Sequence, residues 1–306
     1  MKRILLSGAF AACAAFATAV LLSCDNYEEE SATAFATNEN LNGDAKTKRV
    51  ASIDEYNFFY DDANRLTSVK SSNANITYKI NYNPFSIEKT KLSSESYDIK
   101  LFNFSFSPEG YVTSYCVEGN AVYDEDNFAY NYTEKRDITY DINGRITQVS
   151  YNEYYCDKEI LTGEIDTYKT IGTRIVTWKN GDLVKVKKDE TCVVEKTQND
   201  GSSRTHTRFN TWTKNCQTSS NINHNGQNTI ESGAIIDVGE CDGLLSVLGM
   251  LGKGSLHFVT KCSEEYAEGR IGGETYSGSY TYNYTYETNE DGYVAYDSYN
   301  GRYAYE

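Results

Sequence analysis

The chain has few of the residues on which catalysis and metal binding usually depend. It contains only three histidines, His206, His224 and His257. It has no H-E-x-x-H, G-x-S-x-G or P-loop motif, and no G-x-G-x-x-G in a strand–helix context. We therefore expect no catalytic residue, no cofactor and no metal site, and we expect the protein not to be an enzyme.

Proline is also scarce, with two residues, and alanine and leucine are rare after residue 23. Tyrosine, in contrast, occurs 27 times, and threonine, valine and isoleucine accompany it. These residue types fit a pleated, half-buried surface. An all-β chain of this size often forms one domain. The composition predicts a single all-β domain over residues 51–306.

Basic residues are too few to balance the acidic ones. The chain has 29 lysines and arginines against 44 aspartates and glutamates, a net charge of −15. Such a chain repels phosphates. Nucleic acid and anionic lipid surfaces are therefore excluded as expected partners.

The first residues have the pattern of an export signal. Met1-Lys2-Arg3 precedes an apolar run that ends at Leu21-Leu22-Ser23-Cys24. These four residues resemble the lipobox of bacterial lipoproteins, which implies cleavage before Cys24 and diacylglycerol on its thiol. An uncleaved membrane helix or a simple secretory signal is the alternative. The run favours the lipobox because it has few bulky residues and ends at the required cysteine.

An acidic run follows the cysteine, formed by Asp25, Glu28, Glu29 and Glu30. It resembles the signal with which some Gram-negative anaerobes send lipoproteins to the outer face of the outer membrane. The alternative is a solvated start to a linker. Residues 24–50 are polar and without periodicity, which predicts a flexible tether.

Six cysteines remain beyond Cys24, and none of them forms a C-x-x-C pair. They are Cys116, Cys156, Cys192, Cys216, Cys241 and Cys262. An even number in an exported chain favours disulfides over a metal site or a redox role. Cys241 and Cys262 bracket an apolar segment, so a disulfide between them would hold it. We predict this pair and two more disulfides among the other four.

A hairpin pattern recurs along the chain. Its clearest copy is residues 140–149, where Tyr-Asp-Ile-Asn-Gly-Arg precedes an aliphatic–polar strand. Asn-Gly and Asp-Gly supply positive φ at little cost, so each copy predicts a tight turn between antiparallel strands. The other copies are residues 60–69, 107–112, 178–186 and 289–294. We expect an antiparallel meander of about 10–13 long strands, barrel-like or strongly curved.

This Tyr-Asp-x-x-Gly-Arg unit resembles the repeats of YD-type shell proteins. In a short lipoprotein it is more similar to an uncharacterised family of domains with a porin-like fold. Members of that family carry an apolar helix followed by Gly-Lys and a serine. Residues 243–255 are close to this pattern, with one inserted glycine. The resemblance covers most of residues 51–306 and implies no activity.

The apolar segment itself predicts a short helix over 243–251. Leu244, Val247, Leu248 and Leu251 share one helical face, while Leu245 and Met250 make the other face apolar. A helix that is apolar all round is buried. We expect it to cover one end of a curved sheet, and a lipid contact is the alternative.

The porin-like resemblance does not predict lipid-facing strands. In such strands every second side chain is apolar. Residues 204–214 place charged and polar side chains on one face and mainly threonines on the other. Neither face could lie in hydrocarbon.

One group of tyrosines is a candidate ligand platform. Tyr276 precedes Tyr280, Tyr282, Tyr284 and Tyr286, all at alternate positions of one predicted strand. They either pack on the half-buried face of the sheet or present their rings to a sugar or an extended ligand.

We therefore expect a surface-anchored outer-membrane lipoprotein, held to the membrane by its lipid. We expect a non-catalytic role, in which the protein either binds a glycan or a protein or contributes to the structure of the envelope. The alternatives are a polysaccharide hydrolase that uses a carboxylate pair, or an accessory subunit of an outer-membrane complex. The sequence does not indicate an oligomeric state.

Overall fold

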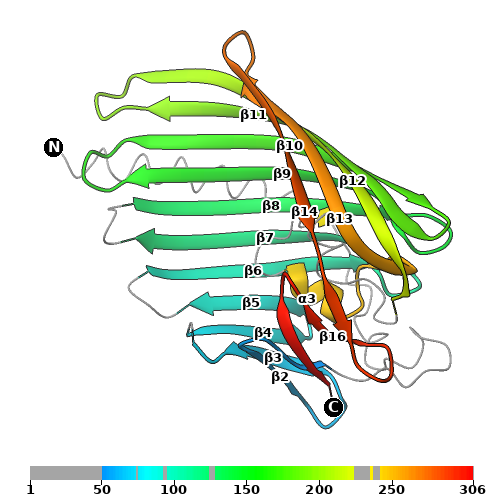
Figure 1. Ribbon diagram of the computed structural model, residues 1–306. Helices are drawn as coiled ribbons and strands as arrows, with labels where there is room; N and C mark the ends of the chain where they lie inside the picture. The colour runs from blue at the N-terminus through cyan, green and yellow to red at the C-terminus, as the bar shows by residue number, and fades with distance from the viewer. Residues whose placement is uncertain are drawn as a thin grey trace.

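The structure, a computed structural model, describes residues 50–73, 75–91, 95–123, 128–223, 235–236 and 242–305 (Figure 1). The predicted signal peptide, Cys24 and the acidic run lie outside the described residues, so those expectations stay predictions.

All 17 strands belong to one antiparallel sheet. The first five are β1 (Val50–Ile53), β2 (Tyr56–Tyr60), β3 (Leu66–Ser71), β4 (Ile76–Tyr82) and β5 (Phe85–Lys91). The long strands are β6 (Glu95–Phe106), β7 (Val112–Tyr123), β8 (Phe128–Tyr140), β9 (Ile146–Glu159), β10 (Ile165–Lys179), β11 (Asp182–Thr197), β12 (Ser203–Ile222) and β13 (His257–Arg270). The last are β14 (Thr275–Asn283), β15 (Tyr286–Thr288), β16 (Val294–Asp297) and β17 (Gly301–Tyr305).

The strands pair in chain order, which is the arrangement of a meander. Each strand from β2 to β14 pairs with the next, while β1 lies between β2 and β17, and β17 pairs with β16. β16 in turn pairs with β15. β14 and β15 follow each other closely in the chain, and the sheet curves so that β13 and β14 cross in front of the long strands (Figure 1).

This architecture confirms the predicted all-β, strongly curved meander with one short helix. The strands outnumber the expected 10–13 because the chain ends form short strands, such as the three-residue β15 and the four-residue β16. Short strands carry too little alternation to be recognised from sequence.

Four of the five recurring hairpins share one turn geometry, while the copy at residues 178–186 has a two-residue turn in which both Asn180 (54°) and Gly181 have positive φ. Positive φ occurs at the expected position of each copy, at Asn64 (61°), Gly110 (90°), Gly144 (77°), Gly181 (91°) and Gly292 (83°). The strand register shifts at each of these turns, which is the signature of a bulge. In the copy at residues 140–149, Asp141 Oδ1 accepts hydrogen bonds from the N–H groups of Asn143 and Arg145.

An aromatic side chain at one hairpin bonds to the bulge of the hairpin before it. Tyr140 Oη donates to Val112 O at 2.7 Å, and Trp178 Nε1 donates to Ile146 O at 2.8 Å. Tyr82 and Tyr305 make the same bond to Leu66 O and Val294 O. All four acceptors are the first strand residues after a turn. We call these the hairpin-to-hairpin bonds, and they account for part of the tyrosine content.

One helix is described, α3 (Asp242–Val247), and it confirms the predicted apolar helix. It ends in a Schellman motif, because Met250 N–H donates to Leu245 O and Gly249 N–H to Ser246 O. Gly249 has φ of 71°, a left-handed conformation that glycine adopts without a Cβ penalty. The helix therefore ends at Val247, four residues before the end that the sequence predicted.

Residues 242–256, which we call the plug segment, bind the turn ends of the sheet. Met250 O accepts from Val112 N–H, while Gly144 O and Gly181 O accept from the N–H groups of Lys253 and Leu256. Leu245 and Leu251 are fully buried in the same core as the sheet residues Ile87, Leu101, Ile146 and Leu183. The plug segment thus covers one end of the curved sheet, as expected.

Candidate functional site

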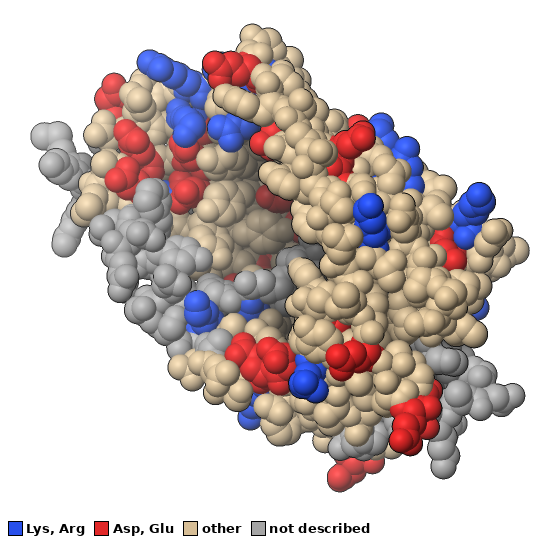
Figure 2. Space-filling view, viewed as in Figure 1, with Lys and Arg blue, Asp and Glu red and all other residues tan. Residues whose placement is uncertain are grey.

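The face of the sheet that meets α3 and residues 235–236, here the inner face, carries two polar rows across β9–β14. Directly opposite residues of antiparallel strands point to the same face. The first row is Val149, Arg174, Lys188, Trp212, Tyr266 and Gly278. The second is Tyr151, Gly172, Glu190, Asn210, Glu268 and Tyr276. Figure 2 shows the molecule hollowed behind its front strands.

Ion pairs and cation–π contacts join the side chains of these rows. Lys188 Nζ lies 2.8 Å from Glu190 Oε2, and the Tyr151 hydroxyl donates to the same oxygen. The Arg174 guanidinium lies 5.2 Å from the Tyr151 ring centroid and 5.8 Å from that of Trp212. Lys188 and Arg174 are buried. A buried charge is stable only when paired, so these contacts fix the rows in place.

Two buried arginines also hold residues 235–236 against the inner face. Arg136 on β8 donates to Ile236 O at 3.3 Å and pairs with Glu134, and Arg174 donates to Ile235 O at 3.4 Å. Both isoleucines are fully buried. Part of the inner charge is therefore structural, because it satisfies backbone carbonyls at the centre of the fold.

Glu153 on β9 is the carboxylate of this face with the most altered acidity. It lies opposite Glu134 on β8. Burial, followed by the negative charges of Glu134 and Glu190, raises the pKa of Glu153 to about 7. This side chain can therefore exchange a proton near neutral pH.

Two groups of tyrosines border the polar rows on the inner face. Tyr130, Tyr155 and Tyr168 form an inner tyrosine row over β8–β10, with successive ring centroids 5.5 Å apart. Tyr266, Tyr276, Tyr280 and Tyr282 form a tyrosine rim on β13 and β14. The rings of Tyr266 and Tyr280 stack with centroids 5.3 Å apart and an interplanar angle of 4°.

The structure divides the tyrosines of the sequence-derived platform. Tyr276, Tyr280 and Tyr282 are 59%, 54% and 41% exposed. Tyr284 and Tyr286 are half-buried, and Tyr286 stacks on Phe258 and donates its hydroxyl to Val259 O. Only the first group can present its rings to a ligand, because the last two belong to the packing at the base of β13.

A shallow pocket of about 230 Å³ lies at the hairpin ends beyond the inner tyrosine row. Asp157, Asp166 and Lys196 line it, and Lys196 pairs with Asp166. Burial and the charge of Asp166 raise the pKa of Asp157. The pocket is polar and adds hydrogen-bonding groups to the same face of the sheet.

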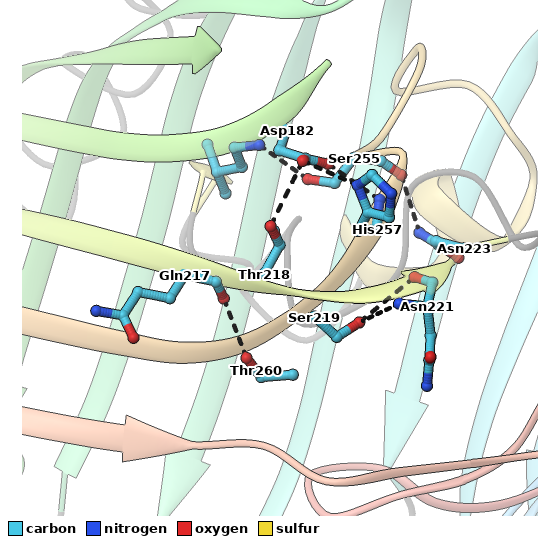
Figure 3. A network of polar contacts seen from close by, with 10 residues as sticks. Asp182, Gln217, Thr218, Ser219, Asn221, Asn223, Ser255, His257 and Thr260 are labelled. Carbon is cyan, nitrogen blue, oxygen red and sulfur yellow. Dashed lines mark hydrogen bonds and ion pairs between the residues drawn. The ribbon is translucent and has the colours of Figure 1, made fainter. Parts of the chain in front are cut away.

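Asp182, Ser255 and His257 come together at the plug segment (Figure 3). Asp182 Oδ2 lies 3.0 Å from His257 Nδ1, and Asp182 Oδ1 accepts the His257 backbone N–H at 3.0 Å. These are the residue types of a hydrolase triad. However, Ser255 is buried and its Oγ accepts the Leu183 N–H at 2.9 Å. The cluster therefore anchors the plug segment and offers no exposed nucleophile.

The structure describes five of the six cysteines that follow Cys24. Cys241 lies outside the described residues, so its pairing with Cys262 stays a prediction. Cys116 is disulfide-bonded, Cys156, Cys216 and Cys262 are buried, and Cys192 is half-buried. Cys262 Sγ lies 2.8 Å from Cys216 Sγ on the neighbouring strand.

In the part of the chain that the structure describes, no group of three or more His, Cys, Asp or Glu side chains could hold a metal ion. No helix among the described residues is long and apolar enough to cross a membrane.

Sequence reasoning missed the charged inner rows. Their signal was present as charged residues at alternate positions, for example Lys188 with Glu190 and Glu134 with Arg136. In a strand that alternation is equally typical of a solvated face. Only the pairing of strands distinguishes the two cases.

Comparison with known proteins gives a structural likeness to a solved structure. No family model matches the chain, and no curated protein matches it. Among solved structures, the chain is similar to a porin-like protein from Bacteroides uniformis, with a TM-score of 0.41 and 12% identity. The match covers 82% of this chain and 90% of that one. The uncharacterised lipoprotein family suggested by the hairpin repeats stays a prediction.

Proposed function

We propose that this protein is a lipid-anchored outer-membrane lipoprotein that binds a glycan on the inner face of its sheet. The observation that carries the proposal is the meeting, on one face, of exposed tyrosines with rows of charged and amide side chains. Tyr276 and Tyr280 are more than half exposed, and the rows that end in the tyrosine rim contain Glu190, Asn210 and Glu268.

The chemistry of these groups fits a sugar. A pyranose has apolar C–H faces, which pack on aromatic rings, and a ring of hydroxyl groups that both donate and accept hydrogen bonds. A carboxylate that is already held by an ion pair, such as Glu190 with Lys188, offers such a partner with little loss of side-chain entropy. The net charge of −15 argues against a nucleic acid or another polyanion.

The spacing of the rim tyrosines along β14 suits a ligand that is longer than a single sugar. Tyr276, Tyr280 and Tyr282 follow the length of β14 at alternate positions. Ligand units spaced along the strand could each meet one ring. We therefore favour an oligosaccharide over a monosaccharide.

The test is a binding screen of the full-length protein in detergent against cello-, malto- and chito-oligosaccharides, read by thermal shift. A ligand that binds the folded state raises the melting temperature by mass action. The matched comparison is Tyr280→Ala against Tyr299→Ala, because Tyr299 is 70% exposed and lies in the turn between β16 and β17, away from the strands β13 and β14 that carry the tyrosine rim. Failure of every oligosaccharide to shift the wild-type protein contradicts glycan binding.

The anchoring part of the proposal has its own test. Cys24→Ala should abolish acyl labelling and release the protein from the membrane fraction. Replacing Glu28, Glu29 and Glu30 by alanine should protect the protein from external protease on intact cells. Membrane retention without labelling contradicts the lipid anchor, and a protected wild type contradicts surface display.

A polysaccharide hydrolase is the second candidate, and one observation favours it. Glu153 has a pKa of about 7 and lies beside Glu134 and Glu190, as a general acid beside a second carboxylate would. Release of reducing ends from a bound oligosaccharide, lost in Glu153→Gln, would support hydrolysis. Binding of the oligosaccharide without release of reducing ends would contradict hydrolysis and support the non-catalytic role.

A further inference from the structure

We infer that Cys216 on β12 and Cys262 on β13 form a disulfide in the mature protein. The two residues are directly opposite each other in the antiparallel pair, so their side chains share a face. Their Sγ atoms are 2.8 Å apart, and both side chains are buried. This partner differs from the Cys241 that the sequence suggested for Cys262.

The backbone suits such a bond without rearrangement. Directly opposite residues of an antiparallel pair have Cα atoms about 4.5–5.5 Å apart. Disulfides span Cα separations of about 4.4–6.8 Å. Two side chains that already share a face and touch need only small rotations to bond.

The position of the pair shows what a crosslink there would stabilise. The regular pairing of β12 with β13 ends one residue later, where the register shifts between Gln217 and Thr218. The chain between Cys216 and Cys262 includes the whole plug segment and residues 235–236. A disulfide would therefore join β12 and β13 at the point where their regular register ends and the irregular pairing toward Ile222 and His257 begins.

The chemistry is an ordinary thiol–disulfide exchange. The thiolate of one cysteine attacks the disulfide of the oxidant, forms a mixed disulfide and releases the first thiol of the oxidant. The thiolate of the second cysteine then attacks the cysteine sulfur of this mixed disulfide and releases the second thiol. The product is the Cys216–Cys262 bond, and the oxidant leaves as two thiols that carry the two electrons and two protons. An exported chain would meet such a disulfide on an envelope oxidoreductase, and oxidised glutathione serves in a test tube.

Two other cysteines provide matched controls. Cys156 on β9 lies opposite Asn131 and Thr167, and Cys192 on β11 lies opposite Thr170 and Arg208. Neither meets a second cysteine on the adjacent strands. Their replacement by serine should leave the Cys216–Cys262 bond unchanged.

The experiment treats the purified full-length protein with oxidised glutathione, alkylates remaining thiols and maps peptides without reduction. We expect one linked peptide containing Cys216 and Cys262, present in Cys156→Ser and Cys192→Ser and absent from Cys216→Ser. Alkylation of both residues overturns the inference, as does linkage of Cys262 to Cys241. Because the oxidant is supplied, the result does not depend on export or on glycan binding.

A stability measurement distinguishes a crosslink with this role from an incidental one. Reduction should lower the melting temperature of the wild type by several degrees more than that of the double variant Cys216→Ser/Cys262→Ser, in which the Cys116 disulfide is still reduced. If reduction lowers both melting temperatures equally, the pair does not stabilise the junction of β12 and β13. The double variant also reveals any loss of folding that the substitutions themselves cause.

Discussion

The ring of Tyr151 on β9 lies in the space that a side chain at Gly172 on β10 would occupy. A Cβ built on Gly172 would overlap the ring and its hydroxyl. The absence of that side chain lets Tyr151 lie across β10 and donate its hydroxyl to Glu190 on β11. One glycine therefore permits a contact between strands that do not pair.

Replacing Gly172 by alanine should displace Tyr151 and weaken the inner network. We expect a loss of about 1–3 kcal/mol in the free energy of unfolding, as for other overpacked core sites. Urea unfolding measures it. Gly119→Ala is the control, because a Cβ there meets Ile99 and Tyr132 at ordinary distances of 3.5 and 3.6 Å. Equal losses in both variants would show that the Tyr151 position is not constrained by Gly172.

Glu153 should make the protein less stable as the pH rises toward neutrality. Its pKa is 4.5 in the unfolded chain and about 7 when folded, so the folded state binds the extra proton. Its contribution is present below pH 4.5 and is lost as the pH rises to 7. A shift of this size corresponds to about 3 kcal/mol.

The measurement is the free energy of unfolding at pH 5 and pH 8, for the wild type and Glu153→Gln. The variant should show a smaller decrease between the two pH values. Glu265→Gln, at an exposed position of β13, should behave as the wild type. An unchanged decrease in Glu153→Gln would mean that another group titrates.

The hairpin-to-hairpin bonds can be tested one at a time. Tyr140→Phe removes the hydroxyl that donates to Val112 O and leaves the ring in place. Because the acceptor is buried, we expect a loss of about 1–2 kcal/mol in the free energy of unfolding. Tyr299→Phe, at a 70% exposed position, should change it by less than about 0.5 kcal/mol. Thermal or urea unfolding compares the two, and a neutral Tyr140→Phe would contradict the role of the bond.

The tyrosine rim should contribute to binding and not to folding. Tyr280→Ala removes a side chain that is 54% exposed, so the melting temperature should change little. Affinity for an oligosaccharide found in the screen should fall at least about tenfold, the loss expected for one stacked aromatic contact. Titration calorimetry measures this affinity. A fall of the same size in Tyr299→Ala would assign binding to another surface.

The sequence predicted the parts of this fold that depend on neighbouring residues. The turn at Gly144 and the helix that begins at Asp242 are local features, set by residues a few positions apart. The contact from Arg136 to Ile236 spans 100 positions, and that between Cys216 and Cys262 spans 46. Such contacts depend on strand register, which alternating polar residues on both faces do not determine.

In the candidate site, too, the sequence predicted the local features and missed those that depend on long-range contacts. Alternation correctly indicated that Tyr276, Tyr280 and Tyr282 share a face, but not which of the tyrosines would be exposed. Tyr286 follows the same spacing and is half-buried because the chain passes there over Phe258. The charged rows beside the rim became visible only when six strands were aligned.

The hairpin-to-hairpin bonds also bear on how such a protein can change over evolutionary time. Tyr140 brings a donor to the preceding hairpin, while Ile146, just after the same turn, offers an acceptor to Trp178 of a later one. A duplicated hairpin would therefore add both a donor and an acceptor for the hairpin-to-hairpin bonds, and a deleted hairpin would remove both. The width of the sheet, and with it the size of the hollow it encloses, can then vary by whole hairpins without leaving an unmatched polar group.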